Sequence, residues 1–509
     1  PAAGPASSVG IPAGLDISAL LAGSAKGLSS AQIAALIAAL QEKQMEIETV
    51  EQSHEDDLLA EFLERARREK MAELERIRAD LDVVVGDMRL LEDRRGQGFI
   101  RDVLERCKDE QHMPADMLSK RRKLEANFAE LQERYLRINA ATPADHPNAT
   151  GEGRSGVVRG FAEDLYKFSR YNGFVVKATL KHGSRDNENS TGTGEVYNAS
   201  NIVSSIEFDR DCEFIATAGV MKRIKIFELQ NITNNLVDIH YPVKEMVTRA
   251  KLSCLSWNSY IRSHLASSDY EGVVTLWDTQ VCQAVAEFEE HDKRAWSVDF
   301  SKISPTNFVS GSDDGRVKLW STTHASSVFT IENRANICCV KFSPEVPQHV
   351  AYGSADHAVY LYDIRNIRKP LFTFRDHSKA VSYVKFLDGE TLVSASTDST
   401  LKMWNLRTGQ LDRTFTGHRN DKNFVGLSVN ADADYVACGS ETNSVYTYYR
   451  ELPRPFLAHR FGAANPLTGE ETEDDAAQFV SSVCWNPKVP TQLLAANSQG
   501  TIKLLELKS

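Results

Sequence analysis

Aspartate and histidine residues recur at set distances in the second half of the chain, and both residue types can do acid–base or metal chemistry. Three Asp residues each stand six positions before an aromatic residue: Asp314, Asp356 and Asp398. Three His residues each stand just before a predicted strand: His291, His377 and His418. A buried Asp or His without a partner costs several kcal/mol. We therefore interpret both sets as a hydrogen-bonded framework, not as a catalytic or metal site.

Other signatures of chemistry are missing from the sequence. It contains no nucleophile motif, no phosphate-binding loop and no paired catalytic carboxylates. The eight cysteines include no C-x-x-C pair, and most fall within predicted strands, as is typical of buried cysteines in a reducing compartment. We expect no cofactor in this chain, and whether it belongs to an enzyme stays open.

Bulk composition narrows the class of protein. The 509 residues, 42% hydrophobic and 25% charged, predict two or more globular domains. A net charge of −11 argues against general nucleic-acid binding. No apolar run is long enough to span a membrane, and the small, apolar start lacks the basic residues of a signal peptide. Because the chain begins with Pro, we expect it to be a fragment.

The elements that would position the Asp and His residues repeat about every 43 residues from Asn201 onward. Each copy holds two alternating apolar runs joined by a polar turn and ends at an anchor: Phe227, Trp277, Trp320, Tyr362, Trp404, Tyr448 and Leu505. This period predicts four-stranded blades, so residues 171–509 should form an all-β, seven-bladed WD40 β-propeller. The run from Tyr171 to Gly183 should add the outer strand of the last blade and so close the ring.

The N-terminal third of the chain is predicted to be largely helical. Residues 1–29 are rich in Ala, Gly, Ser and Pro and should be disordered, residues 30–140 should form a helical, coiled-coil region, and residues 141–170 should be a linker. From Leu58 apolar residues follow a heptad pattern, clearest between Leu74 and Leu91. The alternative is one amphipathic helix packed on the propeller.

A basic run opens the second helical block of this region: Lys120, Arg121, Arg122 and Lys123. Such a run can be a nuclear-import signal or simply the solvated end of a helix, and composition does not separate the two.

Several stretches resemble a known family more closely than blade geometry requires. KRAWSVDF, NICCVKF, SASTDST and, upstream, FLERARREKMAELERIRADL and RRKLEANFAELQERYL resemble the constitutively photomorphogenic RING-type ubiquitin ligase family of plants and animals. In that family a zinc-binding RING finger precedes the coiled coil. No RING cysteine pattern occurs here, so zinc is expected only in a missing upstream RING. A related partner family carries a kinase-like region in that place and stays an alternative.

The resemblance implies a peptide-binding face for acidic motifs that contain a Val-Pro pair. The matching positions are Lys251, Tyr270, Arg294, Trp296, Lys379, Asp421 and Phe424. The three cations would pair with acidic residues, and the three aromatic residues would hold Val-Pro. Asp421 stands where we expect Glu, which shortens its reach.

The resemblance also implies a function. The first reading is the substrate-recognition part of a ubiquitin ligase that directs transcription regulators to degradation, in the nucleus and cytoplasm. The second is a non-enzymatic scaffold, assembled through its coiled coil with itself or a partner, that tunes such a ligase. Tyr362, Asp363 and Arg365 look like a motif that docks propellers on a cullin-ligase adaptor. No nucleic-acid or membrane contact is expected.

Overall fold

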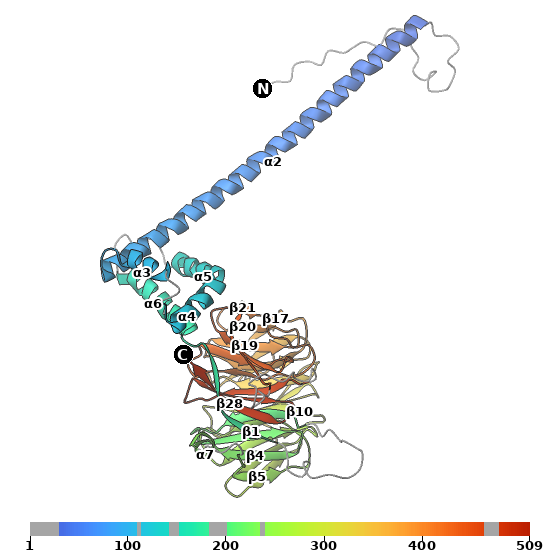
Figure 1. Cartoon of the computed structure of the whole chain (residues 1–509). Helices are drawn as coiled ribbons and strands as arrows, with labels where there is room; N and C mark the ends of the chain where they lie inside the picture. The colour runs from blue at the N-terminus through green and yellow to red at the C-terminus, as the bar shows by residue number, and fades with distance from the viewer. Residues whose placement is uncertain (1–29, 109–112, 142–151, 183–200, 235–239, 463–477) are drawn as a thin grey trace, which may run out of the picture. The chain divides into compact units, whose positions relative to one another are not determined.

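The structure is a computed structural model that describes residues 30–108, 113–141, 152–182, 201–234, 240–462 and 478–509 (Figure 1). It divides into two compact units, Pro1–Asp102 and Val103–Ser509. The expected disordered segment 1–29 and the acidic stretch 469–476 lie outside the described residues.

The first unit is dominated by α2, a single 66-residue helix from Ser30 to Arg95, followed by the start of α3 (Phe99–Lys108). The expected heptad side chains are exposed along it; Ile77 keeps 56% and Leu81 keeps 59% of its surface. Arg67 stands seven residues before Leu74 and pairs with Glu64 at 2.8 Å. Lys70 stands seven residues before Ile77 and pairs with Glu73 at 2.6 Å. The first part of the heptad face is therefore charged. The exposed apolar seam of a long helix is what a coiled-coil strand offers a partner.

The second unit contains seven four-stranded antiparallel sheets among the described residues, which confirms the predicted propeller (Figure 1). Blades 1 to 3 are built from β2 (Val203–Phe208), β3 (Phe214–Gly219), β4 (Arg223–Glu228), β5 (Lys244–Val247); β6 (Leu252–Trp257), β7 (His264–Asp269), β8 (Val274–Asp278), β9 (Gln283–Phe288); and β10 (Ala295–Phe300), β11 (Asn307–Ser312), β12 (Arg316–Ser321), β13 (Phe329–Glu332). Blades 4 and 5 are built from β14 (Ile337–Phe342), β15 (His349–Ser354), β16 (Ala358–Asp363), β17 (Phe372–Arg375); and β18 (Val381–Phe386), β19 (Thr391–Ser396), β20 (Leu401–Asn405), β21 (Gln410–Phe415). Blades 6 and 7 are built from β22 (Leu427–Val429), β23 (Tyr435–Cys438), β24 (Ser444–Tyr449), β25 (Pro455–Arg460); and β26 (Val480–Trp485), β27 (Gln492–Asn497), β28 (Thr501–Lys508) with β1 (Gly173–Lys181). A short helix, α7 (Leu229–Asn234), follows β4.

The ring closes through chain segments from opposite ends of this unit. Strand β1 pairs antiparallel with β28, from Gly173 opposite Lys508 to Lys181 opposite Thr501. This confirms the predicted closing strand. The pairing covers an edge of β28 that would otherwise present unpaired backbone groups.

The predicted framework of Asp and His is confirmed in two blades. In blade 5, His377 Nδ1 lies 2.9 Å from Asp398, its Nε2 lies 2.8 Å from Ser394 Oγ, and Trp404 Nε1 donates to the same hydroxyl at 2.8 Å. Blade 3 repeats the chain with His291 and Asp314 at 2.8 Å.

The remaining members of the two sets take other partners. Asp356 accepts from the Tyr360 hydroxyl at 2.6 Å, and His418 lies 2.9 Å from the Tyr448 hydroxyl. All six residues are therefore bonded within the blade framework.

Three helices precede the closing strand: α4 (Ala115–Ala126), α5 (Phe128–Ala141) and α6 (Glu152–Ser169). The predicted linker 141–170 is wrong for residues 152–169, which form α6. Its apolar residues Phe161, Leu165 and Phe168 follow helical spacing, and Phe168 is buried against blades 6 and 7. Its Gly residues are typical of a linker because they have a weak helix propensity. Burial of the apolar side chains against the propeller outweighs that propensity.

Salt bridges fasten these helices to blade 6. Arg134 of α5 pairs with Asp164 of α6 at 2.5 Å and also with Glu451. Tyr449 donates to Asp164 at 2.9 Å, and Lys167 pairs with Asp434 at 3.0 Å. The helices α4 to α6 are thus part of the propeller unit.

Candidate functional site

One end of the propeller gathers all seven residues proposed for peptide binding. Strands within a blade are antiparallel, so the connections that enter each first strand lie at the same end as the turns between second and third strands. We call this end the top face. The seven residues stand on these connections and turns or directly beside them: Lys251, Tyr270, Arg294, Trp296, Lys379, Asp421 and Phe424.

Three aromatic side chains from different blades meet on the top face. The ring centroids of Tyr270 and Trp296 lie 5.6 Å apart, and those of Trp296 and Phe424 lie 5.0 Å apart. We call these three residues the aromatic slot. Arg294 lies over two of its rings, 4.8 Å from the Tyr270 centroid and 4.9 Å from the Trp296 centroid. The slot therefore offers apolar walls with a cation at its edge.

A β-bulge sets the direction of Trp296. The pairing of β10 with β11 shifts between Ala295 and Ser297, so Trp296 is the extra residue of the bulge. Five other blades have the same shift at the same place, with small residues there: Ser204, Ser253, Cys338, Ser382 and Ser481. A bulge re-aims its side chain, and blade 3 alone of these six aims a large aromatic ring.

Asp313, which the sequence analysis did not single out, holds the slot together. Its Oδ1 accepts a hydrogen bond from Trp296 Nε1 at 2.7 Å and another from Asn336 Nδ2 at 3.0 Å. Its other oxygen lies 3.6 Å from Arg294 Nε. One carboxylate thus orients both the tryptophan and the arginine. The only signal in the sequence is the Asp-Asp pair in the blade 3 turn.

Glu441 is a second residue that the sequence analysis missed. Its Oε1 accepts from the backbone N–H groups of Lys422 at 2.8 Å and Asn423 at 2.7 Å. Burial alone would raise the pKa of Glu441, but the backbone N–H groups of Asn423 and Lys422 outweigh it and hold the pKa below its usual value. The charged carboxylate therefore fixes the loop that carries Phe424.

The rim of the top face carries charged side chains. Asp421 pairs with Arg419 at 3.0 Å and with Lys379 at 3.8 Å, and the hydrogen bond from Arg419 is the main cause of its lowered pKa. Lys251 is exposed, and its carbonyl accepts from Tyr270 N at 2.9 Å. The structure thus brings Lys379 and Asp421 together and places Lys251 beside the aromatic slot.

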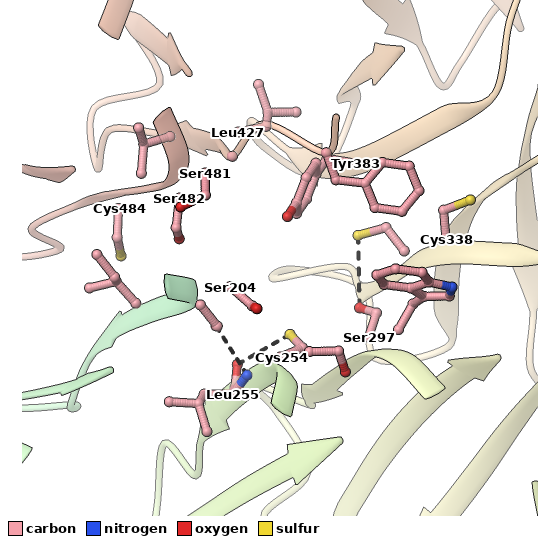
Figure 2. A pocket seen from close by; sticks show the side chains of 18 of the residues that line it. Ser204, Cys254, Leu255, Ser297, Cys338, Tyr383, Leu427, Ser481, Ser482 and Cys484 are labelled. Atoms are coloured by element: carbon pink, nitrogen blue, oxygen red, sulfur yellow. Dashed lines mark hydrogen bonds between the residues drawn. The ribbon is translucent and has the colours of Figure 1, made fainter. Parts of the chain in front are cut away.

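Below the slot a cavity of about 420 Å³ continues into the centre of the ring (Figure 2). Tyr383 of β18 lines it, with its ring edge-on to Phe424 at 6.5 Å. Farther along the first strands, Lys341 pairs with Asp299 at 2.5 Å. Burial alone would lower the pKa of Lys341, but attraction to Asp299 outweighs it and raises the pKa. The cavity is therefore apolar at its mouth and polar within.

The proposed adaptor-docking residues lie at the opposite end: Tyr362 and Asp363 end β16, and Arg365 follows it. Tyr362 is 7% exposed and stacks on Tyr352 in the blade core at 5.7 Å. Asp363 bonds the Arg365 guanidinium at 2.6 Å, and Arg365 keeps 70% of its side chain exposed. Of these three described residues, Asp363 and Arg365 are the ones whose polar groups a partner could reach.

The four basic residues proposed for nuclear import lie on α4. Lys120 pairs with Asp116 at 2.7 Å, and Arg121 bonds the carbonyl of Cys107 and pairs with Glu125. Lys123 bonds the carbonyl of Tyr171, and burial lowers the pKa of Lys123 to about 8. Arg122 is exposed. The run is thus an ordered part of α4, and three of its four side chains are bonded within the protein.

Within the described residues, no group of three or more His, Cys, Asp or Glu side chains could hold a metal ion. The same part of the chain contains no helix that is long and apolar enough to cross a membrane.

The seven four-stranded sheets define the chain as a WD40 β-propeller protein. Residues 282–321 match the family of WD domains with the G-beta repeat, and residues 308–454 match the propeller of Nucleolar protein 10-like N-terminal domains. The chain belongs, more narrowly, to the COP1/SPA-like family of WD40 proteins.

Three curated relatives illustrate this membership. The chain is 48% identical over 399 residues to E3 ubiquitin-protein ligase COP1 of Arabidopsis thaliana, covering 77% of this chain and 57% of the ligase. It is 50% identical over 355 residues to Protein SUPPRESSOR OF PHYA-105 1 of the same plant, covering 68% and 33%. It is 37% identical over 328 residues to WD repeat-containing protein RUP2, also from Arabidopsis, covering 60% and 88%. The chain thus spans little more than half of the ligase relative.

Proposed function

We propose that the top face binds short extended peptides in which an acidic stretch is followed by Val-Pro. The observation that carries the proposal is the aromatic slot with Arg294 stacked at its edge and Lys251 and Lys379 on its rim. Aromatic walls suit the apolar Val-Pro pair, whereas the cations suit acidic side chains. The site needs no covalent chemistry to do this.

In cellular terms, the bound peptide would belong to a transcription regulator, and the chain would be the substrate-recognition part of a ubiquitin ligase. Ubiquitin transfer would require a zinc-binding RING domain, in the same polypeptide or in a partner. The names of the ligase relatives support this proposal.

The second candidate is a non-enzymatic scaffold that tunes such a ligase. The likeness to the SUPPRESSOR OF PHYA-105 1 proteins favours it, together with the exposed heptad face of α2. Both candidates use the same top face for peptides. They differ in whether a RING domain acts together with this chain as a ligase or whether the chain only tunes a separate ligase.

Two further parts of the proposal concern partners and location. Asp363 and Arg365 would contact a cullin-ligase adaptor at the end opposite the slot. The basic run Lys120–Lys123 would support nuclear import, giving a nuclear and cytoplasmic protein. Replacing all four basic residues with Ala should then lower the nuclear fraction of the full chain; an unchanged fraction would contradict the import role.

Fluorescence anisotropy with three labelled peptides tests the peptide proposal. The first carries acidic residues followed by Val-Pro, the second has Ala-Ala in place of Val-Pro, and the third has Asn and Gln in place of its acidic residues. We expect both altered peptides to bind at least about tenfold more weakly, because each loses one half of the recognition. Equal affinity for all three peptides would disprove the proposal.

A further inference from the structure

The cavity beneath the aromatic slot contains hydroxyl groups for which the described part of the chain supplies no hydrogen-bond partner. Among the described residues, Ser204, Tyr383 and Ser482 line the cavity, and their hydroxyls form no hydrogen bond with any of those residues. Figure 2 shows the three side chains around the open space. Tyr383 is half-buried, and a hydroxyl on a cavity wall that has no partner among the described residues is available to a ligand or to water.

Tyr383 contacts the aromatic slot directly. Its ring meets Phe424 edge-on at 6.5 Å, and Phe424 in turn meets Trp296 at 5.0 Å. Burial is the main cause of the raised pKa of Tyr383, so the phenol keeps its proton and can donate. A ligand that reaches from the aromatic slot into the cavity therefore meets a hydrogen-bond donor on the cavity wall.

A Val-Pro segment has a specific need for such a donor. Proline has no backbone N–H, so the segment cannot pair with the protein through the usual strand pattern of donors and acceptors. The carbonyl of the residue before proline remains as an acceptor, next to the proline ring that the slot would hold. A buried carbonyl without a donor is unfavourable, so the Tyr383 hydroxyl would stabilise the bound peptide by donating to it.

We propose that Tyr383 is a further binding residue of the peptide site, and that its hydroxyl donates a hydrogen bond to the peptide carbonyl that precedes proline. This inference rests on the proposed function, which it deepens by naming the backbone group that the site reads. The remaining free hydroxyls, Ser204 and Ser482, keep the deeper cavity polar.

The test combines a protein variant with a peptide variant in the full chain. Tyr383→Phe removes the hydroxyl and keeps the ring against Phe424. A peptide with a thioamide in place of the Val amide weakens the acceptor at the carbonyl before proline. We expect Tyr383→Phe to bind the unmodified peptide about 3- to 10-fold more weakly, and the thioamide to weaken binding to wild type by a similar factor. With Tyr383→Phe the thioamide should make no further difference.

A matched control is Tyr360→Phe, which removes a hydroxyl bonded to Asp356 inside blade 4 and should leave peptide affinity unchanged. The inference would be overturned if Tyr383→Phe bound the unmodified peptide as tightly as wild type does. It would also be overturned if Tyr383→Phe lost the same factor of affinity for the thioamide peptide as for the unmodified peptide. If Tyr383→Phe does not fold, an unchanged affinity of wild type for the thioamide peptide still overturns it. Failure of wild type to bind either peptide would instead reject the proposed function.

Discussion

Trp296 Nε1 donates a hydrogen bond of 2.7 Å to Asp313 Oδ1, and this bond joins the wall of the aromatic slot to a turn seventeen residues later in the chain. The same carboxylate lies 3.6 Å from Arg294 Nε. The top face is therefore preorganised before any peptide arrives, which lowers the ordering cost of binding.

Asp313→Ala should release both Trp296 and Arg294. We expect the acidic Val-Pro peptide to bind more weakly by about 1–2 kcal/mol, the size of a lost hydrogen bond to a charged group at a half-exposed site. Calorimetric titration measures the loss. Asp313→Asn keeps an acceptor for Trp296 and should lose less affinity. If Asp313→Ala binds as tightly as wild type, the preorganisation argument fails.

Asp398→Ala should act on stability and not on recognition. The variant leaves His377 without its carboxylate partner inside blade 5, so we expect the free energy of unfolding to fall by about 2–4 kcal/mol. Denaturant unfolding measures this. Asp356→Ala is the matched control, because Asp356 bonds a neutral tyrosine hydroxyl and should lose less. A loss of peptide affinity by folded Asp398→Ala would contradict a purely structural role.

The pH dependence of stability should follow from the same residue. Burial alone would raise the pKa of Asp398, but hydrogen bonds with His377 and Thr400 outweigh it and hold the pKa well below its ordinary 3.8. The stabilisation is thus fully present above about pH 4 and is lost as pH falls through the lower folded-state pKa. Thermal melts of wild type should show this acid loss, and melts of Asp398→Asn should show a shallower one. If the melting temperatures of wild type and Asp398→Asn fall in parallel as pH is lowered, Asp398 does not cause the acid loss of stability.

The exposed seam of α2 should mediate association. Replacing Leu81 and Val84 with Glu places charges on the heptad face, so we expect the double variant to sediment as a monomer while wild type sediments as a dimer or larger. Ala79→Glu is the control, because Ala79 lies off the seam on the same helix. A wild-type monomer at micromolar concentration would contradict the coiled-coil assignment.

Lys251→Glu should weaken peptide binding by reversing a charge beside the slot. The loss should appear largely in the association rate and should shrink as salt is added, because rim charges are screened. Surface plasmon resonance at two salt concentrations measures both effects. Lys488→Glu, at the opposite end of the propeller, should change neither the association rate nor its dependence on salt. Identical effects of the two variants would show that only net charge is involved.

The sequence predicts the ring well and the site in part. The repeat period of the anchors and the alternation within each copy report local burial, so the seven blades and the closing strand could be foreseen. Trp296 and Phe424 could be named only through family resemblance. Asp313 and Glu441 could not, since their bonds depend on strand register and loop shape. Tyr383 is a strand residue whose open hydroxyl is visible only once the ring is assembled. Helix α6 is hard to predict because its Gly residues are typical of a linker, whereas the burial that stabilises it comes from blades 6 and 7.

The most direct test of the central claim is calorimetric titration of wild type and Trp296→Ala with the acidic Val-Pro peptide. Tyr260→Ala, an exposed aromatic residue at the opposite end of the ring, serves as control. The account predicts that Trp296→Ala stays folded and loses about 2 kcal/mol or more of binding free energy, as buried aromatic anchors do, while Tyr260→Ala binds like wild type. A folded Trp296→Ala variant that binds the peptide as tightly as wild type would contradict it.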